Sequence, residues 1–276
     1  MPSQLEDFTK TGVLTRAYPL VGEYCPHNLQ DGFLVEERIK IIVKTMARDL
    51  DTHHQEGHCI STFDHRNIRI NAAGHAQIIG VTHTAKTKEN IKKNYLDLHD
   101  VVFKTIFRNF SYQQQVPSEW RMLLLLMKRN CIGNEYLICN NVALMPLAIR
   151  MLFFYLCYEH VTFSMWKTKK QKQKRILQKL PYLKNWPDLL KGNYLLEESF
   201  EHKYHDITTP EGFFTFYRDT NKHRMDRCHL LELVGAYTAI FFEKNLLVRY
   251  PLYLFVLQEE LHREKELEEL EPHVLF

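Results

Sequence analysis

The first regular pattern in the chain is an apolar residue at every third or fourth position over residues 35–54. Its apolar members are Ile39, Ile42, Val43, Met46 and Leu50. This spacing predicts a helix with one buried face. Two short strand-like runs follow at residues 68–70 and 76–80, and turn-forming residues 71–74 separate them. The predicted order is therefore helix, loop, strand, turn, strand.

Further along, the apolar and charged stretches predict mostly helices, so we expect a mainly α fold. The most apolar stretch, residues 142–158, is interrupted by Pro146 and Arg150 and is too short to span a bilayer comfortably, so we expect a buried helix. Residues 259–271 carry seven acids among leucines. This pattern predicts a frayed helix or a disordered acidic tail over 259–276, with a partner-binding helix as the alternative.

Composition narrows the class of protein. A chain of 276 residues allows one or two domains. The net charge of +3 is too small to indicate nucleic-acid binding by itself, so any such case depends on local clusters. The six cysteines form no C-x-x-C pair and the N-terminus has no apolar segment. We therefore expect reduced thiols in a soluble protein of the cytoplasm or nucleus, with no membrane insertion.

Histidines are dense between residues 53 and 65. The metal-ligating side chains there are His53, His54, His58, Cys59 and His65. Their spacing matches no zinc pattern, so we interpret them as loop histidines and expect neither a metal nor a cofactor.

Residues 60–68 (ISTFDHRNI) resemble the catalytic loop of a protein kinase, H-R-D-L-K-P-x-N-I. Asn67 is retained, but Thr62 replaces the catalytic aspartate and Asp64 replaces the lysine. Residues 80–82 (GVT) stand where the metal-binding D-F-G belongs, and no Gly-rich loop precedes residues 23–26, which are similar to a hinge. Phosphoryl transfer needs both aspartates, so the resemblance implies a truncated kinase-like C-lobe over residues 17–140 without kinase activity or ATP binding.

The remaining chain resembles another family at six points in the right order. These are residues 146–154, Glu159, residues 183–186 (LKNW), Tyr204, residues 218–223 (RDTNKH) and residues 242–254. They are similar to the all-helical kinase-extension-nuclease (KEN) domain of the endoplasmic-reticulum stress sensor and RNase L. The resemblance implies a KEN ribonuclease-like domain over residues 141–258, fused to the kinase-like lobe and working as a homodimer.

The family's chemistry implies a metal-independent endoribonuclease. The 2′-hydroxyl of RNA attacks the adjacent phosphorus, which leaves a 2′,3′-cyclic phosphate and a 5′-hydroxyl. His223 matches the proton donor, Arg218 the phosphate clamp and Tyr204 a group that orients the phosphate or the 2′-hydroxyl. Glu159 stands where the family has a functional aspartate.

One departure bears directly on activity. Asp219 replaces the family's asparagine, and a carboxylate ~5 Å from the scissile phosphate costs roughly 3 kcal/mol at an effective dielectric near 20. If Asp219 pairs with Arg218 or Lys222 instead, the penalty shrinks but the clamp is partly occupied. The alternative is therefore a degenerate pseudokinase and pseudonuclease that binds RNA or a full-length relative as a regulator or scaffold.

RNA binding has a second candidate region. Residues 167–179 carry seven cations and no acid. We assign RNA contacts to Lys169, Lys170, Lys172 and Lys222, because phosphate neutralisation releases counterions. A solvated basic loop or helix face is the other interpretation of this stretch.

Overall fold

A computed structural model describes residues 3–10, 12–16, 33–108, 116–181, 185–201, 203–222 and 239–276. The described chain is mainly helical, as predicted. It divides into two compact units, with the boundary between Met145 and Pro146. The boundary predicted from the sequence lies between residues 140 and 141, five residues earlier. Within the described residues, no helix combines the length and apolarity needed to cross a bilayer.

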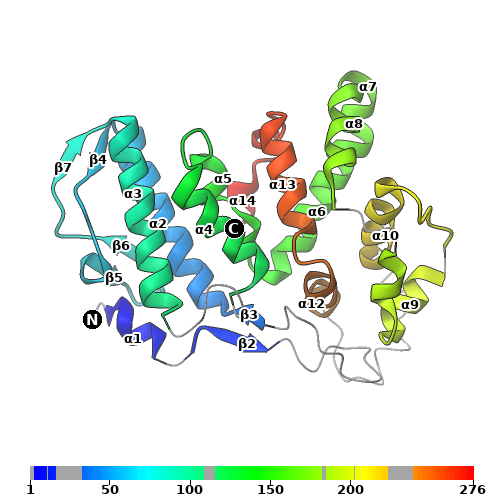
Figure 1. The fold of residues 1–276 in the computed structure, drawn as a ribbon, viewed down its shortest axis with the longest axis horizontal. Coiled ribbons are helices and arrows are strands. Elements are labelled where there is room, and N and C mark those ends of the chain that lie inside the picture. Colours follow the sequence, from blue (N-terminus) through cyan, green and yellow to red (C-terminus); the bar gives the residue numbers. More distant parts are fainter. Residues whose placement is uncertain are drawn as a thin grey trace. The chain divides into compact units, whose positions relative to one another are not determined.

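The first unit consists of helices and three small antiparallel sheets (Figure 1). Its strands are β1 (Ser3–Gln4), β2 (Leu14–Arg16), β3 (Phe33–Val35), β4 (His58–Ile60), β5 (Ile68–Ile70), β6 (Ala76–Ile78) and β7 (His83–Ala85). Its helices are α1 (Leu5–Thr9), α2 (Glu37–Gln55), η1 (His65–Asn67), α3 (Lys88–Val101), η2 (Val102–Ile106), α4 (Ser118–Arg129), α5 (Glu135–Cys139) and η3 (Val142–Leu144). The strand orders are β1-β5-β6, β2-β3 and β4-β7.

Helix α2 is the centre of this unit. It contacts α3, α5, β4 and β6, and the five apolar residues of its predicted face are all fully buried. The predicted strand–turn–strand is confirmed as β5 and β6. In the turn, the Asn71 side chain accepts from the amides of Ala73 and His75, and Gly74 has φ +82°. The helical period and the turn residues were therefore sufficient to place these elements.

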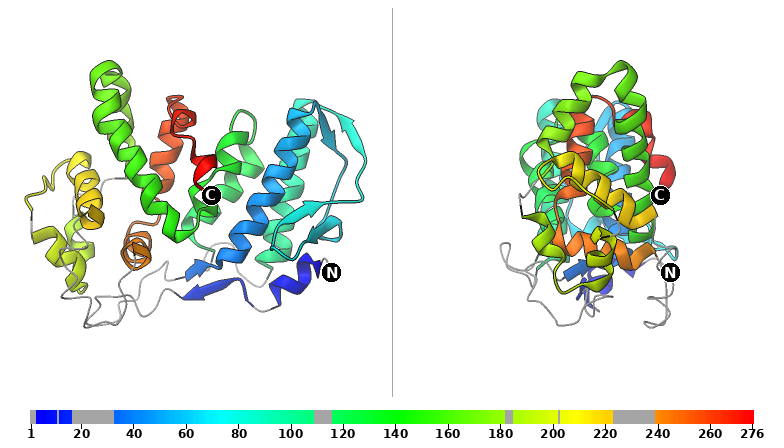
Figure 2. Two further views of the ribbon diagram at one scale, coloured as in Figure 1. Left: turned by 180° about the vertical axis from the view of Figure 1, so that it is seen from behind. Right: turned by 90° about the vertical axis from the view of Figure 1, so that its right-hand side faces the viewer.

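The named elements among the described residues of the second unit are all helices, joined by turns and coil. Its elements are α6 (Leu147–Glu159), η4 (His160–Ser164), α7 (Met165–Thr168), α8 (Lys170–Lys179), η5 (Trp186–Leu190), α9 (Tyr194–Glu201), α10 (Pro210–Lys222), α12 (Ala239–Arg249), α13 (Tyr253–Arg263), η8 (Glu268–Leu270) and α14 (Pro272–Leu275). Helix α6 packs against α10 and α12, and α8 packs against α13. The chain leaves α6 through α7 and turns back as α8, which the green ribbons of Figure 2 show from two sides.

The prediction of one buried helix over residues 142–158 is wrong at its start. Helix α6 begins at Leu147, and the separate 3-10 turn η3 precedes it. Pro146 explains the break, because proline forces the preceding residue out of the helical region, and Met145 has an extended ψ of 136°. The rest of α6 is largely buried as expected, including Phe153 and Phe154.

The prediction of a frayed or disordered acidic tail is also wrong. Residues 259–263 complete helix α13, and the apolar side chains of Leu261 and Leu267 are fully buried. Glu266 is fully buried as well, and η8 and α14 follow it. The tail is ordered because its acids meet cations of α8, as described below.

Candidate functional site

Arg218 is one of the few partly exposed residues of helix α10, with 21% of its side chain accessible. Its guanidinium carbon lies 5.0 Å from the ring centre of Tyr158 on α6, which is cation–π distance. Its backbone carbonyl accepts a hydrogen bond from the Tyr155 hydroxyl at 3.4 Å. Helix α6 therefore holds this arginine in place on two sides.

Asp219 is turned inward, behind Arg218. Its side chain is buried, and its Oδ1 lies 2.8 Å from Nε of Arg218. The two groups form an ion pair but are not aligned for a hydrogen bond. The ammonium of Lys203 lies 3.7 Å from the other carboxylate oxygen. Two cations therefore compensate the charge of Asp219. We call Tyr158, Lys203, Arg218 and Asp219 the arginine cluster.

Tyr204 follows Lys203 directly and is 94% exposed. The contact between Lys203 and Asp219 brings this turn to the arginine cluster. The next residue, His205, is buried against the rings of Phe200 and Phe216. Burial lowers the pKa of His205, although the charge of Asp219 opposes the shift. The exposed phenol of Tyr204 and the partly exposed guanidinium of Arg218 thus belong to one region of the second unit.

The other predicted catalytic residues differ in what the structure says of them. Glu159 is exposed at the last position of α6, directly after Tyr158 of the arginine cluster. Lys222 is exposed at the last position of α10. His223 lies outside the described residues, as do the hinge-like residues 23–26 and Lys184 of the LKNW element. Trp186 of that element is a buried core residue.

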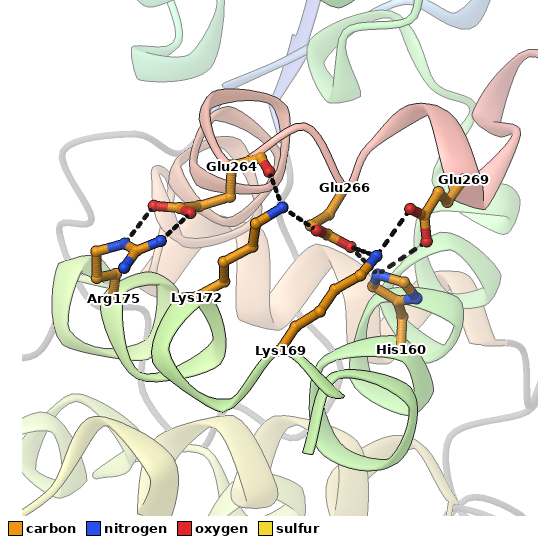
Figure 3. Close-up of polar contacts among 7 residues, drawn as sticks. All are labelled: His160, Lys169, Lys172, Arg175, Glu264, Glu266 and Glu269. Carbon is orange, nitrogen blue, oxygen red and sulfur yellow. Dashed lines mark hydrogen bonds and ion pairs between the residues drawn. The ribbon is translucent and has the colours of Figure 1, made fainter. Parts of the chain in front are cut away.

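Three of the seven cations of the basic stretch are paired with the acidic tail (Figure 3). Lys169 and Lys172 each place their ammonium 2.6 Å from a carboxylate oxygen of Glu266, one on each oxygen. His160 lies 3.0 Å from the same carboxylate. Arg175 donates two hydrogen bonds to Glu264, at 2.7 and 2.6 Å. We call this set, together with Glu269, the acid–base network.

Glu266 is the centre of the acid–base network. Burial raises the pKa of its carboxyl, but the hydrogen bonds from Lys169, Lys172 and His160 outweigh burial and leave the pKa below its ordinary value. The carboxylate therefore stays charged while fully enclosed. Lys170 differs from its neighbours, because its ammonium lies over the ring of Trp166 at 4.4 Å and the residue is exposed. Two of the three predicted RNA-binding lysines of this stretch are thus already engaged inside the protein.

The loop of residues 60–68, whose sequence resembles that of a kinase catalytic loop, is held by polar contacts. The Asn67 amide nitrogen donates to the Ile79 carbonyl at 3.1 Å, and its oxygen accepts from the Asp64 amide at 3.0 Å. Hydrogen bonds from Arg66 lower the pKa of the Asp64 carboxyl to about 2. Thr62 of the same loop is exposed. The side chain of Asn67 therefore has a structural role here.

Sequence reasoning missed Tyr158, Lys203 and His205. The position of Tyr158, directly before the predicted site residue Glu159, could have indicated it. A tyrosine in an apolar helix is usually a packing residue, however, so the sequence gives no reason to single it out. Lys203 is a single cation in a loop, and only the fold brings it to Asp219.

A comparison of the sequence with models of protein families finds no match, and a comparison with curated proteins finds none either.

Proposed function

We propose that the second unit is a metal-independent endoribonuclease of the KEN type, with the arginine cluster as its phosphate-binding element. The observation that carries the proposal is the state of Arg218: it is fixed by Tyr158 and Asp219 and still 21% exposed. Within the described part of the chain, no side chain accepts a hydrogen bond from its Nη atoms. A guanidinium prepared in this way suits a phosphodiester, which accepts two parallel hydrogen bonds.

The reaction needs three tasks performed on one phosphodiester. The 2′-hydroxyl loses its proton and attacks phosphorus, the phosphate gains negative charge, and the 5′-oxygen leaves with a proton. Arg218 stabilises the added charge, exposed Tyr204 orients the phosphate or the 2′-hydroxyl, and His223 gives the proton to the leaving group. DNA lacks the attacking hydroxyl and is not a substrate.

The charge of Asp219 is compensated by two cations, which favours nuclease activity. A bare carboxylate beside the scissile phosphate would repel the transition state. Asp219 is instead buried between Arg218 and Lys203. An aspartate in place of the family's asparagine then raises the activation free energy by less than the roughly 3 kcal/mol expected for an uncompensated charge.

The same ion pair favours a second candidate function. Asp219 occupies the Nε edge of Arg218, at 2.8 Å, so only part of the guanidinium is left for RNA. A degenerate pseudonuclease that binds RNA or a full-length relative, and regulates it, would tolerate this arrangement. Homodimerisation through the second unit, which the family resemblance implies, belongs to both candidates.

For the first unit, we propose a truncated kinase-like C-lobe that transfers no phosphoryl group. Thr62 and Gly80 stand where the base and the metal-binding aspartate are needed. The hydrogen bonds of Asn67 within the loop support a structural role for this remnant. ATP with Mg²⁺ should leave the melting temperature of the full chain unchanged; a clear upward shift would contradict the proposal.

The nuclease proposal is tested by incubating the full chain with a structured RNA in excess EDTA. We expect fragments with 2′,3′-cyclic phosphate ends, and no cleavage when the target ribose is replaced by its 2′-deoxy form. His223→Ala should abolish cleavage, and His273→Ala, which removes an exposed histidine of the same unit, is the matched control.

Arg218→Lys sharpens the test. Lysine keeps a positive charge beside buried Asp219 but lacks the planar fork, so the fold should persist while cleavage falls at least about tenfold. RNA binding without cleavage at any protein concentration would reject the nuclease and support the pseudonuclease. Cleavage equal in wild type and His223→Ala would reject the assigned site.

A further inference from the structure

Three histidines that are distant in sequence meet at one end of helix α2. His53 lies in the last turn of α2, His58 on strand β4 and His83 on strand β7. The antiparallel register pairs His58 with Ala85 and Ile60 with His83, so the two strand histidines are diagonal neighbours on one face. Their ring centres are 4.1 Å apart.

The nitrogen atoms of these rings converge. Nδ1 of His53 is 3.0 Å from Nε2 of His58, and one nitrogen from each of the three rings lies within 4.8 Å of the others. Oε2 of Glu56 is 3.5 Å from Nε2 of His58 and 3.9 Å from Nδ1 of His53. The three ring nitrogens are thus close enough to one another to share an ion, and the Glu56 carboxylate lies beside two of them.

We propose that His53, His58, His83 and Glu56 form a zinc-binding site. Zinc binds imidazole nitrogen and carboxylate oxygen at ~2.0–2.2 Å in tetrahedral geometry, which separates neighbouring ligand atoms by roughly 3.3 Å. The separations of 3.0, 3.5 and 3.9 Å among His53, His58 and Glu56 bracket this value. The ring nitrogen of His83 lies within 4.8 Å of those of His53 and His58. His83 is exposed and the other two histidines are partly exposed, so an ion has access from solvent.

Such an ion has a structural consequence. It joins the end of α2, the core helix of the first unit, to the short two-stranded sheet β4–β7. A sheet of two three-residue strands is marginal by itself, and a metal that binds only the folded state stabilises that state. The site revises the sequence-based interpretation of these residues as loop histidines. The linear spacing concealed it, because His83 joins the set only through strand pairing.

The test uses the full chain, stripped with EDTA and desalted. Zinc affinity is measured by competition with a chromophoric chelator, and Co²⁺ absorption reports coordination geometry. We expect one zinc ion per chain, a tetrahedral Co²⁺ spectrum and a melting temperature raised by zinc but not by Mg²⁺, which prefers oxygen ligands. Affinity should fall as the pH is lowered from about 7.5 to about 5.5, since imidazoles must be deprotonated to bind.

Variants make the test decisive. His83→Ala should weaken zinc binding by at least about tenfold, since loss of even outer-shell partners costs 10- to 100-fold. The control His75→Ala removes an exposed histidine from the β5–β6 turn of the same unit and should leave affinity unchanged. Glu56→Gln should weaken binding while circular dichroism stays native. Absence of binding, or equal affinity in wild type and His83→Ala, would overturn the proposal, and neither result bears on RNA cleavage measured in EDTA.

Discussion

Arg218 and Asp219, adjacent on helix α10, form an ion pair with 2.8 Å between Nε and Oδ1. The carboxylate is buried and the guanidinium is partly exposed. The pair therefore presents its cationic member to solvent and keeps its anionic member inside. This orientation is the main structural reason to retain a phosphate-binding role for α10, even though an aspartate stands beside the arginine.

Asp219→Asn tests how far the carboxylate limits catalysis. If the proposed nuclease site is correct, the change removes a negative charge near the scissile phosphate and introduces the amide of the KEN motif that the sequence resembles. The single-turnover cleavage rate should then rise about tenfold, or ~1.4 kcal/mol in barrier. The rate is measured with end-labelled RNA at saturating protein. Asp188→Asn is the matched control, since Asp188 forms an exposed pair with Lys191 and its loss should leave the rate unchanged. A folded Asp219→Asn variant with an equal or lower rate would mean that the carboxylate supports the site.

A second buried pair should dominate the stability of the second unit. Arg150 on α6 donates to Glu243 on α12 at 2.7 Å, and the Tyr217 hydroxyl donates to the other oxygen of Glu243 at 2.9 Å. Glu243→Gln removes the carboxylate charge that faces buried Arg150, which should cost about 3–5 kcal/mol of unfolding free energy in urea titrations. The exposed pair lost in Asp188→Asn should contribute far less, because solvent screens exposed ion pairs. If Glu243→Gln lowers the unfolding free energy no more than Asp188→Asn does, the assigned role of the buried pair is wrong.

The sequence predicted what depends on local pattern. The buried face of α2 follows from its 3.6-residue period, and the β5–β6 turn follows from Asn71 and Gly74, because these signals lie within a few residues of one another. The start of α6 was missed although its cause, Pro146, was visible. The apolar character of residues 142–158 favours one continuous helix, but the restriction that proline places on the residue before it interrupts that helix at Pro146.

Contacts between distant residues could not be predicted in this way. Lys169 and Glu266 are 97 residues apart, and each belongs to a run of like charge that, taken alone, looks solvated. Only the packing of α8 against α13 brings them together. The same limit hid the approach of Lys203 to Asp219 and of His83 to His58. The resemblance to the KEN family is what assigned catalytic roles to Arg218, Tyr204 and Glu159. These roles stay predictions.

RNA affinity should depend on the lysines of α8 that are not paired with the acidic tail. Lys170 is exposed over Trp166, whereas Lys172 binds Glu266 at 2.6 Å. Lys170→Ala should weaken RNA binding and reduce the slope of log affinity against log salt by about 1, without loss of stability. Lys172→Ala should lower the melting temperature and change the salt slope little. Fluorescence anisotropy over a salt series measures both, and equal slopes for wild type and Lys170→Ala would exclude Lys170 from the RNA interface.

The stability of the second unit should depend on pH through Glu266. The pKa of its carboxyl is below the ordinary 4.5 in the folded chain, because hydrogen bonds from Lys169, Lys172 and His160 outweigh burial. A depressed folded-state pKa contributes stability that is complete above the ordinary value and is lost as the pH falls through the folded value. Glu266→Gln should therefore cost about 3 kcal/mol at neutral pH. The difference from wild type should shrink as the pH falls below about 4.5.

Urea titrations of wild type and Glu266→Gln from neutral to acidic pH measure this difference. Glu269→Gln is the matched control, since Glu269 belongs to the same network but is 53% exposed. Its replacement should cost less than about 1 kcal/mol and show little pH dependence. Because other acids also titrate in this range, the informative quantity is the gap between wild type and variant. A gap that stays constant down to about pH 3 would show that proton binding by Glu266 does not control the acid sensitivity of this unit.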